Sequence, residues 1–347
     1  MRKGALFLTA GAVVLIAAAA AVRYVVLPMV HQVPSDVDNT LKYTGTVSMI
    51  NPAAMASGDV SKMFLTNVAV TAEQHVKAVE VSGRTVVMSS DTTVKGPDGA
   101  AILTSNHIYA LDRVTLEAAA PPTGSSNVET HTGLALGFPL TPEKKEYQYW
   151  DTTTQTAVPA KYAEDDVRGG RDTYVYRVHA EGPIKDAKIQ AMLPQTLPKA
   201  ILPLLAKALP QAIQDALAQF LPALPESMPL NYTSTTDSTF WVDKKTGIVI
   251  DVDQQQVIKA SLSGALAAAP LPAAFDLSIK STDDTVKANA SDAVEAENGL
   301  MLIGTYVPAG LAALGVVLFL VSIVLLVRKR RPDGATEQAA AQTTEQA

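Results

Sequence analysis

Two long apolar stretches lie at the two ends of the chain, and basic residues border each of them. The first runs from Ala5 to Val22 without a charge and continues after Arg23 through "YVVLPMV". The second, Val307–Val327, is followed at once by "RKRR". Eighteen residues rise about 27 Å as a helix, which approaches the thickness of a bilayer core. We therefore predict transmembrane helices over residues 5–30 and 299–327, the second continuing from a helical pattern that starts near Ser291.

The basic residues predict the orientation of both helices. Lys and Arg accumulate on the cytoplasmic side of membrane spans. Residues 1–4 and 328–347 should then be cytoplasmic, and residues 31–298 should form an extracytoplasmic domain. The polar end of the chain has no apolar periodicity, so we expect it to be disordered. The residues that carry this prediction are Arg2, Lys3, Arg328, Lys329, Arg330 and Arg331.

The N-terminal segment has a second interpretation. Arg2 and Lys3 precede the apolar run, and "AAAAAV" offers small residues for cleavage, as in a secretory signal peptide. The apolar character continues past Arg23 to Val30, which favours an uncleaved helix. Both interpretations stay open at the level of sequence.

Between the two ends, short β-prone runs alternate with turn residues. This character is found up to Gly182 in "LKYTGTVSMI", "HVKAVEVSGRTVVMSSDTTV" around Ser82-Gly83, "AILTSNHIYALDRVTLEA", "KKEYQYWDTTTQTAVPAKY" and "RDTYVYRVHAEG". It resumes in "NYTSTTDSTFWVDKKTGIVIDVDQQQVIKASLS" and "AFDLSIKSTDDTVKANAS". Runs rich in Val, Ile, Thr and aromatic residues, bounded by Gly, Pro, Asp and Asn, are typical of strands. The pattern predicts an α+β protein with a large β-rich domain.

Residues 190–229 break this pattern with an apolar, proline-rich insertion. Apolar positions recur at helical spacing over Leu197–Leu209 and Pro210–Leu221, with Lys199, Lys207 and Asp215 on the opposite faces. Neither segment is long enough to span a bilayer. We predict two or three amphipathic helices that form a cap on the β-rich domain. Their apolar faces would either pack on that domain or contact an apolar ligand, and the residues are Leu197, Ile201, Leu204, Leu205, Ile213, Leu217, Phe220 and Leu221.

Composition and charge narrow the chemistry. The chain has 347 residues, a formal net charge of −6 and no cysteine. Disulfides, thiolate zinc sites and cysteine nucleophiles are therefore excluded. The acidic balance gives no basic face for nucleic acid.

Motifs of catalysis are missing from the sequence as well. There is no Gly-x-Ser-x-Gly elbow, phosphate-binding glycine loop or dinucleotide fingerprint. The acidic pairs Asp165-Asp166 and Asp283-Asp284 lack the ligand spacing of a calcium loop, so solvated turns are expected there. The histidines show no metal-ligand spacing and are expected at the surface or in strands: His31, His75, His107, His131 and His179. We predict no cofactor, no metal and no enzymatic activity.

Several phrases resemble one family of membrane proteins. They are "LKYTGTV", "YALDR", "GFPLTPEKKEYQYWD" and "FWVDKKTGIVID", and with the two terminal spans they cover nearly the whole chain. They resemble the actinobacterial proteins of unknown function that are labelled the porin PorA family, which implies a cell-envelope protein. The layout of two terminal spans around a β-rich ectodomain with an apolar helical insertion is also similar to the scavenger-receptor class B family, whose members capture lipids at a helical apex.

These features lead to ranked expectations about function. The first is a plasma-membrane protein of the cell envelope that is anchored twice and binds or transfers an apolar ligand, for which we expect lipid. The second is a structural module that docks another envelope protein through the cap. A pore and a hydrolase are further alternatives. A hollow β-rich domain would favour the first expectation, and a filled core beneath an exposed cap would favour the second.

Overall fold

The computed structural model describes residues 2–51, 54, 62–203, 211, 214–215, 221–262 and 271–327 of the chain. The chain divides into two compact units. One unit comprises residues 1–31 and 296–347, and the other is the β-rich unit Gln32–Glu295.

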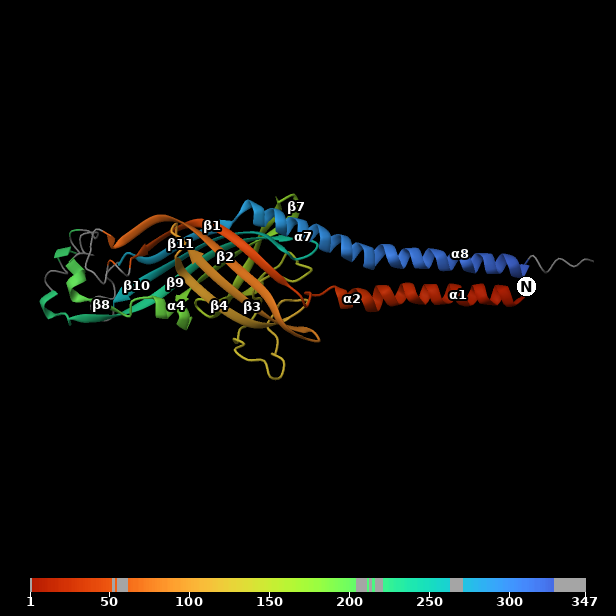
Figure 1. Ribbon diagram of the computed structural model, residues 1–347, viewed down its shortest axis with the longest axis horizontal. Helices are drawn as coiled ribbons and strands as arrows, with labels where there is room; N and C mark the ends of the chain where they lie inside the picture. Colours follow the sequence, from red (N-terminus) through yellow and green to blue (C-terminus); the bar gives the residue numbers. More distant parts are fainter. Residues whose placement is uncertain are drawn as a thin grey trace, which may run out of the picture. The chain divides into compact units, whose positions relative to one another are not determined.

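The first unit is a pair of antiparallel helices that pack through small residues. Its elements are α1 (Arg2–Ala21), η1 (Val22–Val26), α2 (Leu27–Val30), η6 (Leu302–Tyr306) and α8 (Val307–Val327), together with the end of α7 (Asp283–Met301). Figure 1 shows α1 and α8 side by side. Ala12 is fully buried, and a Cβ on Gly315 would lie 3.1 Å from the Ala12 carbonyl oxygen. The Thr9 and Ser322 hydroxyls are 2.7 Å apart, and Ser322 also donates to the Ala5 carbonyl. Small residues and hydroxyl pairs of this kind hold helices together in lipid.

The outer surface of this helix pair is apolar. Leu6 and Phe7 of α1 are 67% and 77% exposed, and Leu320 and Val324 of α8 are each 55% exposed. Two segments, Lys3–Val30 and Asp283–Val327, are long and apolar enough to cross a membrane. Exposed side chains of this size do not belong in water over so long a surface, so the helix pair supports a membrane location.

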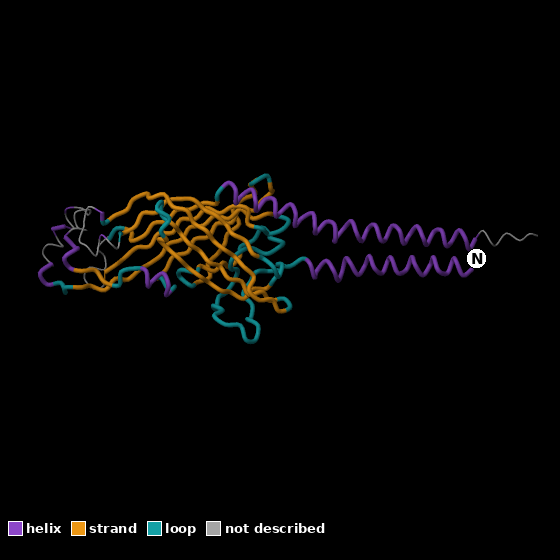
Figure 2. Tube along the Cα trace, in the orientation of Figure 1, coloured by secondary structure: helices purple, strands orange, loops and turns teal. Residues whose placement is uncertain are grey.

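The second unit is built on one antiparallel sheet (Figure 2). The order along it is β4-β3-β2-β1-β11-β10-β9-β7-β6-β5, and β8 pairs with β9. The bounds are β1 Asp38–Ile50, β2 Phe64–Ser82, β3 Thr85–Lys95, β4 Ala101–Asp112, β5 Tyr147–Asp151, β6 Thr156–Arg168, β7 Arg171–Pro183, β8 Thr196–Pro198, β9 Ser227–Asp243, β10 Val249–Leu262 and β11 Ala273–Ser281. The strands predicted from the sequence are confirmed in type, with two exceptions: the run at 101–118 is a strand only to Asp112, and the run at 274–291 is a strand only to Ser281. The rest of that last run belongs to α7, which begins at Asp283, eight residues before the predicted Ser291.

The sheet curls, and its two edge strands are linked at one end. Leu111 of β4 forms a bridge with Ala118, Glu117 with Leu134, and Leu134 with Tyr149 of β5. Leu134 donates to the Gln148 carbonyl at 2.7 Å and accepts from the Trp150 N–H at 2.8 Å. These bonds satisfy edge groups that would otherwise be open to pairing with another chain. At the other end of β4, the short helix α4 (Ala187–Met192) lies against the strand.

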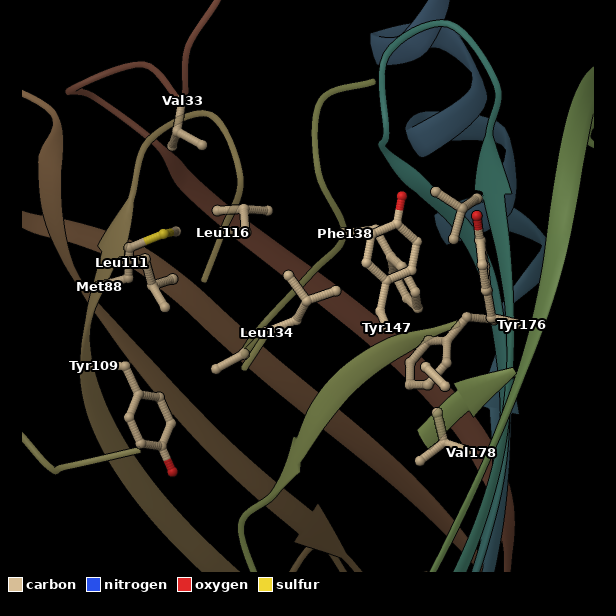
Figure 3. Close-up of a cluster of buried hydrophobic side chains, with 14 of the residues drawn as sticks. Val33, Met88, Tyr109, Leu111, Leu116, Leu134, Phe138, Tyr147, Tyr176 and Val178 are labelled. Carbon is tan, nitrogen blue, oxygen red and sulfur yellow. The ribbon is translucent and has the colours of Figure 1, made fainter. Parts of the chain in front are cut away.

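An aromatic core fills the linked end of the curled sheet. Phe138 stacks on Tyr176 with ring centroids 4.6 Å apart, and Tyr147 meets Phe138 edge-on at 6.2 Å (Figure 3). The loop that carries Phe138 is held by the turn between β9 and β10. Gly247 has φ +72° there, and a Cβ would lie 2.1 Å from the Pro139 carbonyl oxygen, so only glycine fits.

Charged and other strongly polar residues of several strands face outward. Arg177 and His179 of β7 are exposed. Their neighbours Tyr176 and Val178 are buried. The same alternation continues on β10, where Asp253, Gln255 and Lys259 are exposed. Successive side chains of a strand point to opposite faces, so the outer face of the curled sheet is suited to water.

The insertion at 190–229 differs from its prediction in the part that the structure describes. Leu197 lies in β8 and pairs with Met228, so a helix does not begin there. Pro198 has extended backbone angles, and a 3-10 turn, η3 (Lys199–Ile201), follows it. Proline lacks the N–H that a helix interior needs, which explains the later start. A second 3-10 turn, η4, spans Leu221–Ala223.

Candidate ligand-binding site

The curled sheet surrounds a cavity of about 240 Å³. Its walls come from β1, β2, β3, β4, β5, β7, β9, β10 and β11, with Ile189 of α4 at one side. More than half of the wall is apolar, including Leu41, Val94, Leu103, Tyr109, Tyr149, Trp150, Phe240, Leu277 and Ile279. The remainder is polar: Gln74, Ser90, Thr92, Ser105, His107, Asp151, Thr152, Thr153, Thr236, Ser238, Gln254 and Gln256.

The polar part of the wall consists almost entirely of neutral amides and hydroxyls. Among the described residues that line the cavity there is no Lys and no Arg. The one carboxylate of the wall, Asp151, accepts hydrogen bonds at its Oδ2 from the Thr154 N–H at 2.7 Å and from the Thr154 hydroxyl at 2.6 Å. Burial raises the pKa of Tyr43 and of Tyr149 far above the ordinary value, so both phenols are neutral at pH 7.

Two hydrogen-bonded networks fix polar side chains on different strands of the wall. Tyr43 donates to Gln74 Oε1 at 3.0 Å, and Gln74 Nε2 donates to the Ser90 hydroxyl at 2.9 Å. Gln256 Nε2 donates to the Thr153 hydroxyl at 2.8 Å. Buried amides held in this way keep one orientation and leave their remaining groups available to a ligand.

One hydroxyl on the wall has no partner. Thr236 is 7% exposed, and its Oγ1 is buried without a hydrogen bond to any described residue. An unpaired buried hydroxyl costs about 1–3 kcal/mol, and natural structures rarely keep one without a reason. Because Thr236 lines the cavity, a bound molecule can supply the missing bond.

A buried histidine joins α4 to the edge strand beside the cavity. His107 of β4 is 6% exposed, with Nδ1 2.9 Å from Glu129 Oε2 and Nε2 3.4 Å from Asp186 Oδ2. Asp186 caps α4 by accepting from the Lys188 N–H at 2.8 Å, and the Lys188 ammonium bonds to the Asn106 carbonyl. Burial opposes the charge on His107, but the two carboxylates outweigh it and raise its pKa, while His107 and the α4 N–H groups lower the pKa of Asp186 against the effect of burial.

A second, smaller pocket adjoins the first. It measures about 50 Å³ and shares Leu103 and Ile189 with the larger cavity. Its wall is apolar, and it includes Ile102, Met192, Leu193, Ile258 and Phe275. The interior of the sheet therefore offers a mixed compartment followed by a wholly apolar one, with Ile189 of α4 between them.

The family is decided by a comparison with protein-family models. The model described as Porin PorA matches residues 4–324. The chain belongs to the Porin PorA family. This agrees with the resemblance carried by "GFPLTPEKKEYQYWD" and "FWVDKKTGIVID". A membrane location is consistent with the family and with the two apolar helices.

Other comparisons add little to the Porin PorA assignment. No curated protein matches the chain. Among solved structures it is similar, at 10% identity and a TM-score of 0.13, to the peroxisomal multifunctional enzyme type 2 of Drosophila melanogaster, over 70% of this chain and 37% of that enzyme. It is also similar, at 12% identity and a TM-score of 0.13, to a conserved hypothetical protein of Mycobacterium tuberculosis with a double hotdog fold, over 78% of this chain and 80% of that one. Likenesses this low carry no argument about activity.

The predicted cap residues of this Porin PorA chain are only partly described. Leu197 and Ile201 are 4% and 7% exposed, and they pack with Met63, Leu202 and Met228. Leu221 is half-buried against the same cluster. These three residues pack on the protein itself, and they do not line the cavity. Leu204, Leu205, Ile213, Leu217 and Phe220 lie outside the described residues, as do Arg328, Lys329, Arg330 and Arg331.

The sequence did not identify the cavity or its histidine. His107 lies in a strand, as expected, but His131 is 6% exposed in the β4–β5 connection, where a surface residue was expected. Asp165 and Asp166 lie in β6, not in a turn. No group of three His, Asp or Glu side chains suited to a metal ion occurs among the residues that the structure describes. A signal for the cavity does exist: Ser234, Thr236 and Ser238 occupy inward positions of β9 where large apolar residues would fill a core.

Proposed function

We propose that this protein is anchored in the membrane by its two terminal helices and that its β-rich unit binds an amphipathic ligand, a lipid or a lipid-like molecule, in the cavity of the curled sheet. The observation that carries the proposal is the adjacency of a mixed compartment of about 240 Å³ and an apolar compartment of about 50 Å³. A molecule with a polar end and an apolar end matches these two adjacent compartments.

The energetics favour such a ligand over a wholly polar one. Apolar surface removed from water contributes about 25 cal/mol per Å² before ordering costs. The wall of the second pocket favours apolar groups, since Ile102, Ile258 and Phe275 offer no side-chain hydrogen bonds. The polar end would exchange its water for the amides and hydroxyls of the larger cavity, which keeps the net cost of its desolvation small.

The arrangement around α4 suggests the route of entry. Ile189 lies on α4 and borders both compartments. The helix has only six residues, and its attachment depends on the His107 pair and on Lys188. A short element with few anchoring contacts opens more easily than the strands around it. Ligand would pass where α4 moves away from β4.

The packing of the terminal helices supports an uncleaved anchor. Ala5, Ala12 and Ala19 are buried in the helix pair at seven-residue intervals. Arg23 donates to the Gly304 carbonyl at 3.0 Å, in the η6 segment where the helical hydrogen-bond pattern changes. Such matched contacts serve a helix that stays with the protein. Both termini would lie in the cytoplasm, as the flanking basic residues indicate, and the β-rich unit would lie outside.

A pore through the curled sheet is disfavoured by its outer face. A membrane barrel needs an apolar band toward lipid, but Glu73, Lys77 and Lys259 project from the strands as exposed side chains. A hydrolase centred on His107 is disfavoured by its partners, because both ring nitrogens face carboxylates and none faces a hydroxyl nucleophile. A docking module that uses the 190–229 insertion stays an alternative.

Lipids retained by the full-length protein test the proposal. The protein would be purified in an amphipathic polymer without detergent, extracted with organic solvent and analysed by mass spectrometry. A Ser238→Phe variant fills the cavity from β9, and Thr239→Phe places the same ring on the outer face next to it. We expect wild type and Thr239→Phe to retain a defined molecule in stoichiometric amount and Ser238→Phe to lose it. Equal retention by all three proteins would contradict the proposal.

A further inference from the structure

The polar half of the cavity has a composition that selects among head groups. This inference rests on the proposed function and adds the chemical class of the ligand. We infer that the polar end of the ligand is uncharged and carries several hydroxyl groups, as in a glycoside or a polyol, and that carboxylate, phosphate and ammonium head groups are disfavoured.

The described wall offers no free cation to an anion, because both ring nitrogens of His107 already face carboxylates. The described lining contains no Lys and no Arg, while Asp151 contributes a negative charge. The carboxylates of Asp186 and Glu129 lie next to His107 at the side of the cavity. A carboxylate or phosphate moved from water into such a site would lose hydration without gaining an opposite charge, and uncompensated burial of that kind costs several kcal/mol.

The state of the carboxylates argues against a cation. Asp151 Oδ2 already accepts two hydrogen bonds from Thr154. Asp186 and Glu129 already face the two ring nitrogens of His107. An ammonium group would therefore meet one partly satisfied carboxylate, Asp151, and two carboxylates that His107 already faces.

The groups that do face the cavity suit hydroxyls. Amides and hydroxyls both donate and accept, and so does each hydroxyl of a sugar or polyol. Among the described contacts, the Thr236 hydroxyl has no partner, and Gln254, Ser238, Thr92 and Ser105 make no side-chain hydrogen bond. These groups come from β3, β4, β9 and β10, so they approach a ligand from several directions. Sites that hydrogen-bond a hydroxyl strongly reject an analogue without it, because their own polar groups are then left unpaired.

The test uses the two tryptophans of the chain as internal reporters. Trp150 lines the cavity, whereas the Trp241 indole donates to Asp166 and stacks on Arg168 away from it. A Trp241→Phe background leaves Trp150 as the single tryptophan. Four bromine-labelled probes with the same alkyl chain would be titrated against the full chain in a tryptophan-free amphipathic polymer: an alkyl glucoside, a fatty acid, an alkyl phosphate and an alkyl amine. Polymer without protein corrects for partitioning.

We expect the glucoside to quench Trp150 saturably and the three charged probes to bind at least ten-fold more weakly. Thr236→Val, which removes the unpartnered hydroxyl at constant shape, should weaken glucoside binding about five-fold. Thr235→Val on the opposite face of β9 should leave it unchanged.

The outcomes separate the two proposals. If all four probes bind with similar affinity, or a charged probe binds most tightly, the head-group inference is wrong and the proposed function stands. If no probe quenches Trp150 saturably, both are wrong. If Thr236→Val and Thr235→Val have the same effect, the hydroxyl of Thr236 does not contact the ligand and the assignment of the polar wall is overturned.

Discussion

Replacing His107 by Phe should detach α4 from the edge of the sheet. The substitution keeps a ring beside Tyr109, on which His107 stacks with centroids 5.9 Å apart. It removes the cation that faces Asp186 and Glu129, whose side chains are 4% and 33% exposed. Asp186 is then left buried as an unpaired carboxylate at the N-cap of α4.

The size of the effect follows from burial. Removing one partner of a buried ion pair costs about 3–5 kcal/mol. Water can reach Glu129, and Asp186 keeps its bond from the Lys188 N–H, so we expect the lower end, about 3 kcal/mol. That energy corresponds to a factor on the order of one hundred in the opening equilibrium of α4.

His179 provides a matched control. It also lies on a strand, and its Nδ1 is 2.7 Å from Asp237 Oδ1, but the two side chains are 60% and 62% exposed. Exposed pairs contribute about 0–1 kcal/mol, so His179→Phe should change little.

Hydrogen exchange of the α4 amides, read by mass spectrometry on the full chain, measures this opening directly. The Gln190 N–H, which bonds to the Asp186 carbonyl at 3.0 Å, is the clearest reporter. We expect a loss of protection on the order of one hundred-fold in His107→Phe and less than about five-fold in His179→Phe. Similar losses in the two variants, or unchanged protection in His107→Phe, would refute the reasoning from burial.

Three further predictions concern pH, the sheet and the helix pair. The pKa of His107 is raised from 6.5, so its contribution to the stability of α4 is complete below about pH 6.5 and is lost as the pH rises through the folded value. The pKa of Asp186 is lowered, so its contribution is present above about pH 4 and is lost at lower pH. Protection of the α4 amides, corrected for intrinsic exchange, should be greater at pH 5.5 than at pH 8.5, and the reverse order would be inconsistent with this pair. Asp243→Asn should lower the unfolding free energy of the β-rich unit by about 3 kcal/mol, because Asp243 is 1% exposed and accepts from Arg171 Nε at 2.8 Å. Glu164→Gln, in an exposed pair with Arg177, should lower it by less than about 1 kcal/mol. Equal shifts of the two variants in denaturant unfolding would argue against this difference. Gly315→Leu should separate the two helices, since a Cβ at this position lies 3.0 Å from Ile16 Cγ1. In a protein that also carries Thr9→Cys and Ser322→Cys, it should block the disulfide between the two cysteines, whereas Gly310→Leu, with no atom within 4 Å of its Cβ, should permit it. Disulfide formation in both variants would count against this helix packing.

The sequence predicts where the helices and most strands lie, but it does not predict which strands pair. Local alternation located β1, β2, β7, β9 and β10, because a half-buried strand shows its period of two directly. Apolar runs with basic borders located the two terminal helices for the same local reason. The pairing of β1 with β11 depends on contacts between residues such as Tyr43 and Ser281, which no local pattern encodes.

The candidate site illustrates the same limit. His107, Glu129 and Asp186 come from a strand, a loop and a helix cap, and the fold alone brings them together. The helical spacing of the 190–229 insertion wrongly predicts that a helix begins at Leu197. Pro198 favours extended backbone there, and β9 offers a strand partner. The stretch "NYTSTTDST" has small hydroxyl residues at its inward positions, which is a signal for a cavity, but the location of that cavity follows only from the curl of the sheet.

The most direct test of the central claim compares the two tryptophans in the presence of one ligand. Single-tryptophan proteins that keep either Trp150 or Trp241 would be titrated with a bromine-labelled alkyl glucoside. Trp150 lines the cavity, and Trp241 stacks on Arg168 outside it. We predict saturable quenching of Trp150 at a stoichiometry of one and no saturable quenching of Trp241. Weak, linear quenching of both to the same extent would show that the glucoside does not occupy the cavity and would contradict the account.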